Sequence, residues 1–365
     1  SACRRARVFA FVAAENPAAG AAEGHFGRHD LPTHKGTQVR SKPKALLGVL
    51  LVLALFAAGC GDDDGEEASG EGDGAEELTP ITVGILPIGG LAPFFYGVEQ
   101  GFFEDEGLDV RTEIGEGGAA FTPAVLSDEY QFAVGESLSL MLARQNDVGI
   151  QVVSNLTNGA ERPDRGTDAL LVAPDSGIDS ADDLAGKTIA VNGLQGIGEV
   201  GLGAILEEQG VDASGVSFIE VSFPEMNAAV EAGEVDVAWQ VEPFITLGEQ
   251  DGLVNLLDPL YETEPSLPVG LVFASEEWLE ENPELANAFY RALQRSLDAA
   301  SDEAAMRETI VANTETPPDL AQEMALDNWQ PEIDREKLAV LGELATRYGI
   351  LEEEPNLDEL VWTPD

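Results

Sequence analysis

Histidine and cysteine are scarce in this chain and confined to its beginning. The three histidines are His25, His29 and His34, and the two cysteines are Cys3 and Cys60. Residues 61–365 therefore contain no imidazole and no thiol. This part cannot form Cys/His zinc sites, Ser–His–Asp triads or histidine general bases, and only carboxylates remain for acid–base chemistry. We predict no metal site, no cofactor and no catalytic residue.

Basic residues are also few, with 19 Lys and Arg against 68 Asp and Glu. From Cys60 onward the counts are 11 and 65, a formal charge of −54. Such a surface repels nucleic acid and anionic lipid, so neither is an expected partner. We interpret the acidity as a source of solubility.

A continuous apolar run occurs at residues 45–58, where 14 residues are too few to span a bilayer comfortably. A basic stretch at 39–44 precedes it, which is typical of a secretory signal peptide. The run ends in small residues before Cys60, as in a lipobox, although Ala57 replaces the usual Leu. We predict lipid attachment at Cys60. We also expect translation to begin at Val39, which would leave residues 1–38 untranslated.

An acidic segment separates this leader from the rest of the chain. Residues 61–80 hold nine acidic side chains and no basic one among Gly, Ser and Ala. Because this composition is too polar to bury a core, we expect a flexible tether.

Residues 223–244, FPEMNAAVEAGEVDVAWQVEPF, predict a helix, a strand and the start of another helix. The strand would deliver Trp239, Gln240 and Glu242 to its carboxyl end, where open α/β sheets bind ligands. Residues 124–134 and 229–239 share four of eleven positions in the same context, which suggests two related lobes.

Three segments resemble signatures of one family of bacterial solute-binding proteins, the SsuA-like nitrate/sulfonate/taurine and thiamine-precursor family. They are residues 93–110, PFFYGVEQGFFEDEGLDV, residues 183–192, DLAGKTIAVN, and residues 223–244. The resemblance covers roughly residues 81–365. Eukaryotic relatives that make the thiamine pyrimidine depend on histidine, which residues 61–365 lack.

The resemblance implies an α/β fold of the periplasmic-binding-protein-like type II, with two lobes and a two-strand hinge. We expect lobe 1 at 81–168 and 275–365, lobe 2 at 174–268, and a hinge of paired strands at 169–173 and 269–274. Helices at 283–301, 320–329 and 335–348 should cover lobe 1.

The expected ligand-binding residues follow the strands of both lobes. At helical spacing, aromatic residues such as Phe94 and Phe95 more often belong to the core, and a serine placed as Ser137 is more often only a helix cap. In the family the turn that contains Gly117 approaches the ligand with backbone amides. The full set is Gly90, Phe94, Phe95, Gly117, Glu136, Ser137, Asn155, Gln195, Gly196, Trp239, Gln240 and Glu242.

Residues 196–201 formally match GxGxxG, which would indicate a dinucleotide site. We reject this interpretation because the expected strand ends at Val191, several residues before the first glycine. The N-terminus of the following helix could still bind a ligand oxygen.

We predict a solute-binding protein rather than an enzyme. It would be an extracytoplasmic, monomeric lipoprotein, anchored to the bacterial cell membrane, that captures a small organic molecule and hands it to the permease of an ABC importer. Ligand would bridge both lobes and stabilise a closed state. Aromatic and acidic strand tips favour a pyrimidine-like or other organic nitrogen compound. The alternatives are an anion such as nitrate, a sulfonate or taurine, an enzyme of the same fold acting on a pyrimidine-like or amine substrate, and a non-transport sensor domain.

Overall fold

The computed structural model describes residues 78–115, 118–163 and 166–364. The predictions for the leader, for Cys60, for nearly all of the acidic tether and for Gly117 lie outside these residues.

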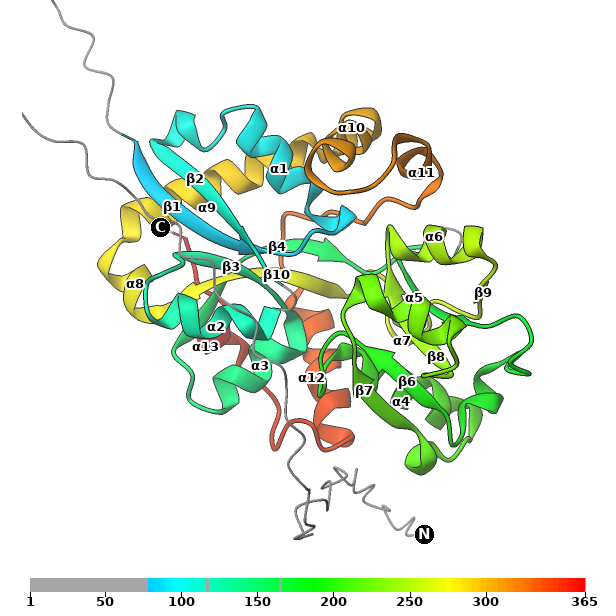
Figure 1. Cartoon of the computed structure of the whole chain (residues 1–365). Helices are drawn as coiled ribbons and strands as arrows, with labels where there is room; N and C mark the ends of the chain where they lie inside the picture. The colour runs from blue at the N-terminus through cyan, green and yellow to red at the C-terminus, as the bar shows by residue number, and fades with distance from the viewer. Residues whose placement is uncertain (1–77, 116–117, 164–165, 365) are drawn as a thin grey trace, which may run out of the picture. The chain divides into compact units, whose positions relative to one another are not determined.

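The first of two five-stranded sheets has the order β2-β1-β3-β10-β4 (Figure 1). The first three of these strands are parallel, whereas β10 runs antiparallel to both β3 and β4. The strands are β1 (Thr79–Ile85), β2 (Leu108–Ile114), β3 (Phe132–Glu136), β4 (Ile150–Asn158) and β10 (Pro268–Ser275). Strand β1 begins inside the segment that composition assigned to the tether.

The second sheet repeats this arrangement with the order β7-β6-β8-β5-β9. Its strands are β5 (Asp168–Val172), β6 (Thr188–Val191), β7 (Ser217–Glu220), β8 (Val237–Val241) and β9 (Val254–Asn255). Strands β3 and β8 hold the same position in their sheets, and they come from the two segments, 124–134 and 229–239, whose sequences match. The predicted relation between the lobes therefore agrees with the topology.

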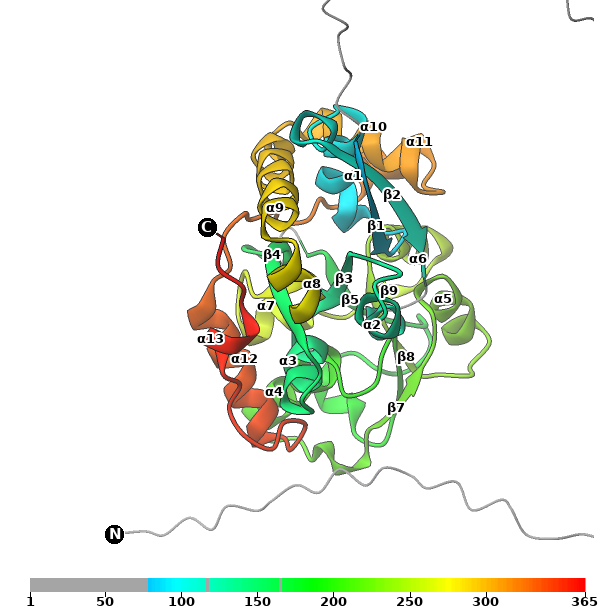
Figure 2. The ribbon, with the colours of Figure 1, turned by 90° about the vertical axis from the view of Figure 1, so that its left-hand side faces the viewer.

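Alternating side chains bury both faces of the first sheet. Val134 and Val272 face a core shared with α1 (Ala92–Glu99) and α9 (Pro283–Asp298), while Ala133 and Phe273 face the opposite core. That opposite face carries α2 (Gly118–Leu126) and α3 (Ser137–Gln145) (Figure 2). Because neighbouring side chains of a strand point to opposite faces, each strand contributes to two cores.

Helices also cover both faces of the second sheet. Trp239 of β8 packs towards α4 (Ile197–Gln209) and α7 (Pro259–Thr263). Ala238 faces the other way, towards α5 (Phe223–Glu231) and α6 (Phe244–Asp251). The core around Trp239 is continuous with the α2–α3 core of the first sheet.

The predicted pairing of 169–173 with 269–274 is wrong. Strand β5 pairs with β8 and β9, whereas β10 pairs with β3 and β4. The chain crosses between the sheets just before each of these strands. There the Gly159 amide donates to Leu267 O (2.8 Å) and the Ser266 amide donates to Ala160 O (2.9 Å). The two apolar runs that we predicted to cross between the lobes are instead buried strands of the two sheets. Each is apolar throughout because both of its faces pack against a core.

The C-terminal region does more than cover lobe 1. It contains α8 (Glu276–Glu281), α10 (Glu303–Asn313), α11 (Pro318–Glu323), α12 (Arg335–Arg347) and α13 (Leu357–Leu360). Helix α12 packs against both α3 and α4 (Figure 1). Just beyond α12, the Tyr348 hydroxyl donates to Glu207 Oε2 of α4 (2.6 Å). The expectation that this helix serves lobe 1 alone is therefore wrong, since its apolar stripe enters the core that both lobes share.

The helix expected at 320–329 is also shorter than predicted. It ends at Glu323, and the Arg307 guanidinium binds the carbonyl oxygens of Ala321 and Met324 at that end. Met324 is already extended, so residues 324–330 run on as irregular chain towards the second sheet. This early end places Asp327 beside residues of both sheets.

Candidate functional site

Four carboxyl groups gather where the two sheets meet, and we call Asp168, Glu242, Asp258 and Asp327 the carboxylate cluster. Asp168 begins β5, and its Oδ1 accepts a hydrogen bond from Trp239 Nε1 (3.3 Å). The pair forms because Asp168 and Trp239 lie on adjacent antiparallel strands and on the same face of the sheet.

Asp258 caps the N-terminus of α7 and completes this side of the cluster. Its Oδ1 accepts from the amides of Leu260 (3.1 Å) and Tyr261 (3.0 Å). Its Oδ2 is buried and has no hydrogen-bond partner within the described residues. A buried carboxylate oxygen without a partner is costly, so this atom is available to a donor.

Glu242 ties the end of β8 to the C-terminal region. Its carboxylate accepts from the amide (3.1 Å) and the hydroxyl (2.8 Å) of Thr246 in α6, and from the amide of Ala325 (3.1 Å). Asp327 lies two residues further on. A Cβ built on Gly90 would lie 3.3 Å from Asp327 Oδ1, so the loop after β1 passes directly beside this carboxyl.

Burial raises the pKa values of all four groups, and repulsion within the cluster adds to the rise at Asp168 and Asp327. The pKa of Asp168 lies well above its ordinary value because of burial first and then the charges of Asp258 and Asp327. Burial raises the pKa of Asp258 to about 6, and burial with the charge of Glu242 raises that of Asp327 to about 7. Burial also raises the pKa of Glu242.

In the part of the chain that the structure describes, the cluster has no basic partner. Among the residues that the structure describes, none of the four carboxyl groups forms an ion pair with a basic side chain. Close carboxyl groups without a counter-charge attract a cation or a group rich in hydrogen-bond donors. The cluster is therefore chemically suited to a protonated amine or an amino-substituted heterocycle.

Three of the predicted site residues adjoin this cluster. Glu242 belongs to it, and Trp239 donates to Asp168. Gly90 lies beside Asp327, and its carbonyl oxygen accepts from Trp329 Nε1 (2.8 Å).

Asn155 lies close by without facing the cluster directly. The strand runs on past it to Asn158, so Asn155 is not at a strand tip. Its Nδ2 donates to Asn158 Oδ1 (2.7 Å) and to Gln330 O (2.6 Å), which fastens the 324–330 segment to β4. Its Oδ1 is buried without a partner in the described part of the chain.

Glu136, Gly196 and Gln195 form a second meeting point of the two lobes. Glu136 is the last residue of β3, and its Oε1 accepts from the amide of Ile197 (3.0 Å), the first residue of α4. Gly196 is the N-cap of α4, whereas the Gln195 side chain is exposed. The Gln195 amide donates to Glu199 Oε1 (2.7 Å).

The aromatic prediction for the first lobe is wrong. Phe94 is only 1% exposed, and its ring meets the rings of Phe95 and Phe103 edge-on. Both predicted rings belong to the core between the sheet and α9. Both residues lie on the buried face of α1, and this position on the helix places their rings in the core.

Two polar predictions also need correction. Gln240 lies on the opposite face of β8 from Trp239, and its Nε2 donates to Phe223 O (2.9 Å) and Asn227 Oδ1 (2.9 Å) in α5. The alternation of the strand directs these neighbours to opposite faces of the sheet. Ser137 does not cap α3, because Glu136 is the N-cap and accepts from the Leu138 amide (3.2 Å).

Sequence reasoning missed three members of the cluster. Asp258 precedes Pro259, a pattern typical of a helix start, and Asp168 precedes the apolar run of β5. Both signals were available, but neither indicates that the two groups meet. Asp327 carried no signal, because it was assigned to the interior of a helix.

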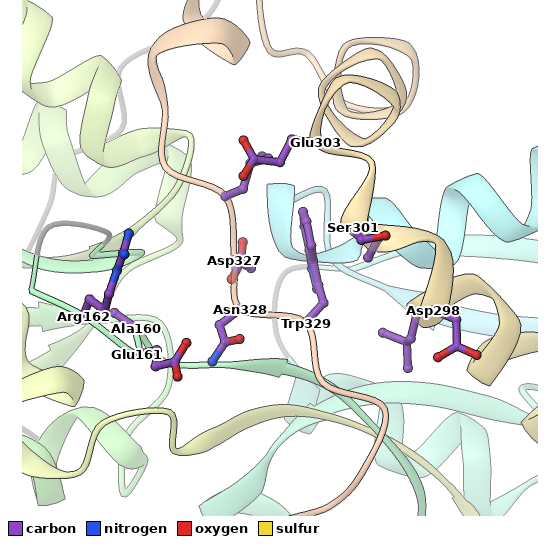
Figure 3. Close-up of a pocket in the computed structure, with 12 residues that line it drawn as sticks. Ala160, Glu161, Arg162, Asp298, Ser301, Glu303, Asp327, Asn328 and Trp329 are labelled. Atoms are coloured by element: carbon purple, nitrogen blue, oxygen red, sulfur yellow. The ribbon is translucent and has the colours of Figure 1, made fainter.

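A pocket of about 580 Å³ opens beside the 324–330 segment. Figure 3 shows Asp327, Asn328 and Trp329 on this segment, with Glu161 and Arg162 from the crossing on one side and Asp298 and Ser301 from the first lobe on the other. The pocket therefore borders the cluster through Asp327 and gives it a route towards the surface.

The GxGxxG match has a packing role. A Cβ on Gly198 would lie 3.2 Å from the Trp239 ring, and one on Gly201 would lie 3.4 Å from it. These glycines let α4 approach Trp239 closely. Close packing of α4 against Trp239 therefore explains these glycines without a dinucleotide.

The described residues contain neither a metal-binding arrangement nor a membrane-spanning helix. No group of three or more Asp, Glu, Cys or His side chains in this part is arranged to hold a metal ion. No helix in it is both long enough and apolar enough to cross a membrane.

The chain belongs to the NMT1/THI5-like family, whose family model matches residues 90–305. It is 25% identical over 317 residues to the riboflavin-binding protein RibY of Chloroflexus aurantiacus, covering 84% of this chain and 82% of that one. It is 22% identical over 246 residues to the formylaminopyrimidine-binding protein of Halalkalibacterium halodurans, covering 67% and 71%.

Solved structures show the same fold. The ligand-binding component of an ABC-type import system from Staphylococcus aureus, with zinc bound, superposes with a TM-score of 0.69 at 16% identity, covering 78% of this chain and 97% of that one. The periplasmic aliphatic sulphonate binding protein SsuA from Escherichia coli gives 0.62 at 14%, covering 78% and 92%. The predicted periplasmic-binding-protein-like fold and the predicted family are confirmed.

Proposed function

We propose that this protein is the solute-binding component of an ABC importer and that its ligand is a small organic nitrogen compound. The observation that carries the proposal is the carboxylate cluster, which lies between the two lobes of a binding-protein fold and has no basic partner among the described side chains. Its relatives include proteins named for riboflavin and formylaminopyrimidine, two nitrogen heterocycles, which supports this ligand class.

The ligand would be held by charge and by donor–acceptor complementarity. A protonated amine or an exocyclic amino group would donate to Asp168, Asp258 or Asp327. Trp239 would hold Asp168 in place through its indole N–H. Ligand bound between the lobes would favour the closed state over the open one, and the permease would recognise that state.

The location of the protein follows from the leader. We propose that Cys60 carries the lipid, that residues 61–80 act as the tether, and that the binding protein works as a monomer outside the cytoplasmic membrane. Metabolic labelling with a fatty-acid analogue tests the lipid anchor directly. A Cys60→Ser variant should lose the label, and a wild-type protein that takes up no label would contradict the anchor.

A ligand screen by thermal shift tests the function. The panel should contain aminopyrimidines, riboflavin, polyamines, nitrate and taurine, each far above its expected dissociation constant. A ligand at about 100 times Kd adds about 2.7 kcal/mol to the free energy of unfolding. We expect a shift with an organic nitrogen compound and none with the anions. A shift with nitrate or taurine alone would overturn the ligand class.

An enzyme of the same fold is the competing interpretation. Glu136 and Glu242 are the carboxylates that it would use, yet both accept several hydrogen bonds at helix N-termini. We therefore expect the ligand found in the screen to be recovered chemically unchanged after prolonged incubation. A product detected by mass spectrometry, and lost in a Glu242→Gln variant, would favour the enzyme.

A further inference from the structure

The Glu136 carboxylate joins two helices that belong to different lobes. Oε1 accepts from the amide of Leu138 in α3 (3.2 Å) and from the amide of Ile197 in α4 (3.0 Å). Oε2 accepts from the Ser139 hydroxyl (3.0 Å). A residue at the end of a first-lobe strand thus occupies the N-terminus of a second-lobe helix, where a helix favours negative charge.

The backbone of α4 leaves room for this carboxylate. A Cβ built on Gly196 would lie 2.9 Å from Glu136 Oε2, closer than a real Cβ would approach. The next acidic group of the helix, Glu199, is already engaged with the Gln195 amide (2.7 Å). The Ile197 amide at the start of α4 and the Gln195 amide just before it are therefore both served by carboxylates of this chain.

The described surroundings of Glu136 contain no basic side chain paired with it. Among the described residues it forms no ion pair with Lys or Arg. Ser137, the next residue, is fully buried, and its hydroxyl has no partner in the described part of the chain. Removal of the carboxylate would consequently expose unpaired donors at the start of both α3 and α4.

We propose that Glu136 determines specificity by occupying the anion position at the α4 N-terminus, so that anionic solutes are excluded from the space between the lobes. The inference rests on the proposed solute-binding function. An anion at this position would have to displace the Glu136 carboxylate from the amide of Ile197 and then lie beside its charge. A cationic or neutral solute at the carboxylate cluster meets no such obstacle.

Removing the carboxylate should turn this position into an anion site. The probes are formate, which matches the removed group, and nitrate and methanesulfonate. Binding is measured by calorimetry at pH 8.5 on the wild type and on Glu136→Ala, Glu136→Gln and Glu225→Ala. Glu225 is the matched control, since it is an exposed acid in the first turn of α5.

We expect Glu136→Ala to bind at least one of the anions roughly tenfold or more tightly than the wild type. Glu136→Gln keeps an oxygen at the position of Oε1, and it should gain less than the alanine variant. Glu225→Ala should bind as the wild type does.

Two outcomes would overturn the inference. One is a wild-type protein that itself binds nitrate or methanesulfonate in the calorimeter at pH 8.5, a result that requires no variant to fold. The other is a Glu136→Ala protein with a native circular dichroism spectrum that binds none of the three anions. The thermal-shift screen with organic nitrogen compounds uses the wild-type protein and is a separate test. If no such compound bound, the proposed function would be contradicted, while the anion measurements would still decide the role of Glu136.

Discussion

The buried carboxyl groups should make this protein more stable in mild acid than in mild base. Glu136 gives the clearest case, because burial raises its pKa from 4.5 to about 7 despite hydrogen bonds from Ser139, Leu138 and Ile197 that act in the opposite direction. Between these two values the folded protein holds a proton that the unfolded chain has released. The free energy of unfolding must therefore fall as the pH rises from about 4.5 to 7.

The size of the effect follows from the same two values. The gap from 4.5 to about 7, at 1.36 kcal/mol for each pH unit, corresponds to about 3 kcal/mol for Glu136 alone. This contribution is complete below pH 4.5 and is lost above about pH 7. Asp168, Glu242, Asp258 and Asp327 act in the same direction, because burial raises the pKa of each.

Urea denaturation at several pH values from about 5 to 8 measures the effect, and the Glu136→Gln variant isolates it. The amide has the size of the carboxyl group but does not titrate, so the fall in stability should shrink by up to about 3 kcal/mol. The exposed control Glu225→Gln should retain the wild-type slope. Stability that rises with pH, or equal slopes for the wild type and Glu136→Gln, would refute the reasoning.

Three further predictions concern single contacts. Gly97→Ala should lower the free energy of unfolding by about 1–3 kcal/mol in urea, because its Cβ would lie 1.8 Å from Ser296 Oγ, and a second change, Ser296→Gly, should recover part of the loss. Tyr348→Phe should cost about 1 kcal/mol through the lost 2.6 Å hydrogen bond to Glu207, and an unchanged urea midpoint would contradict this bridge between α12 and α4. Trp239→Phe should weaken binding of the screened ligand about fivefold by calorimetry, since Asp168 loses its indole donor, and an unaltered Kd would remove Trp239 from the site.

The sequence by itself determined the fold family and most of the strands. Residues 223–244 were expected to form a helix, a strand and the start of another helix, and they form α5, β8 and the first residue of α6. Alternating and continuous apolar runs are local signals, because a strand buries the side chains that its own spacing presents. The placement of Glu136 and Glu242 at the ends of β3 and β8 is likewise a matter of local order along the chain.

Only the tertiary structure decided which of these groups meet. The direction of the Gln240 side chain depends on the face of β8 that packs against α5. The burial of Phe94 depends on α9, which is almost 200 residues away in the sequence. Asp168, Asp258 and Asp327 come together because two chain crossings and the early end of α11 bring distant segments to one place. Their mutual repulsion, which gives the site its chemistry, exists only between groups that the folded chain has brought close together.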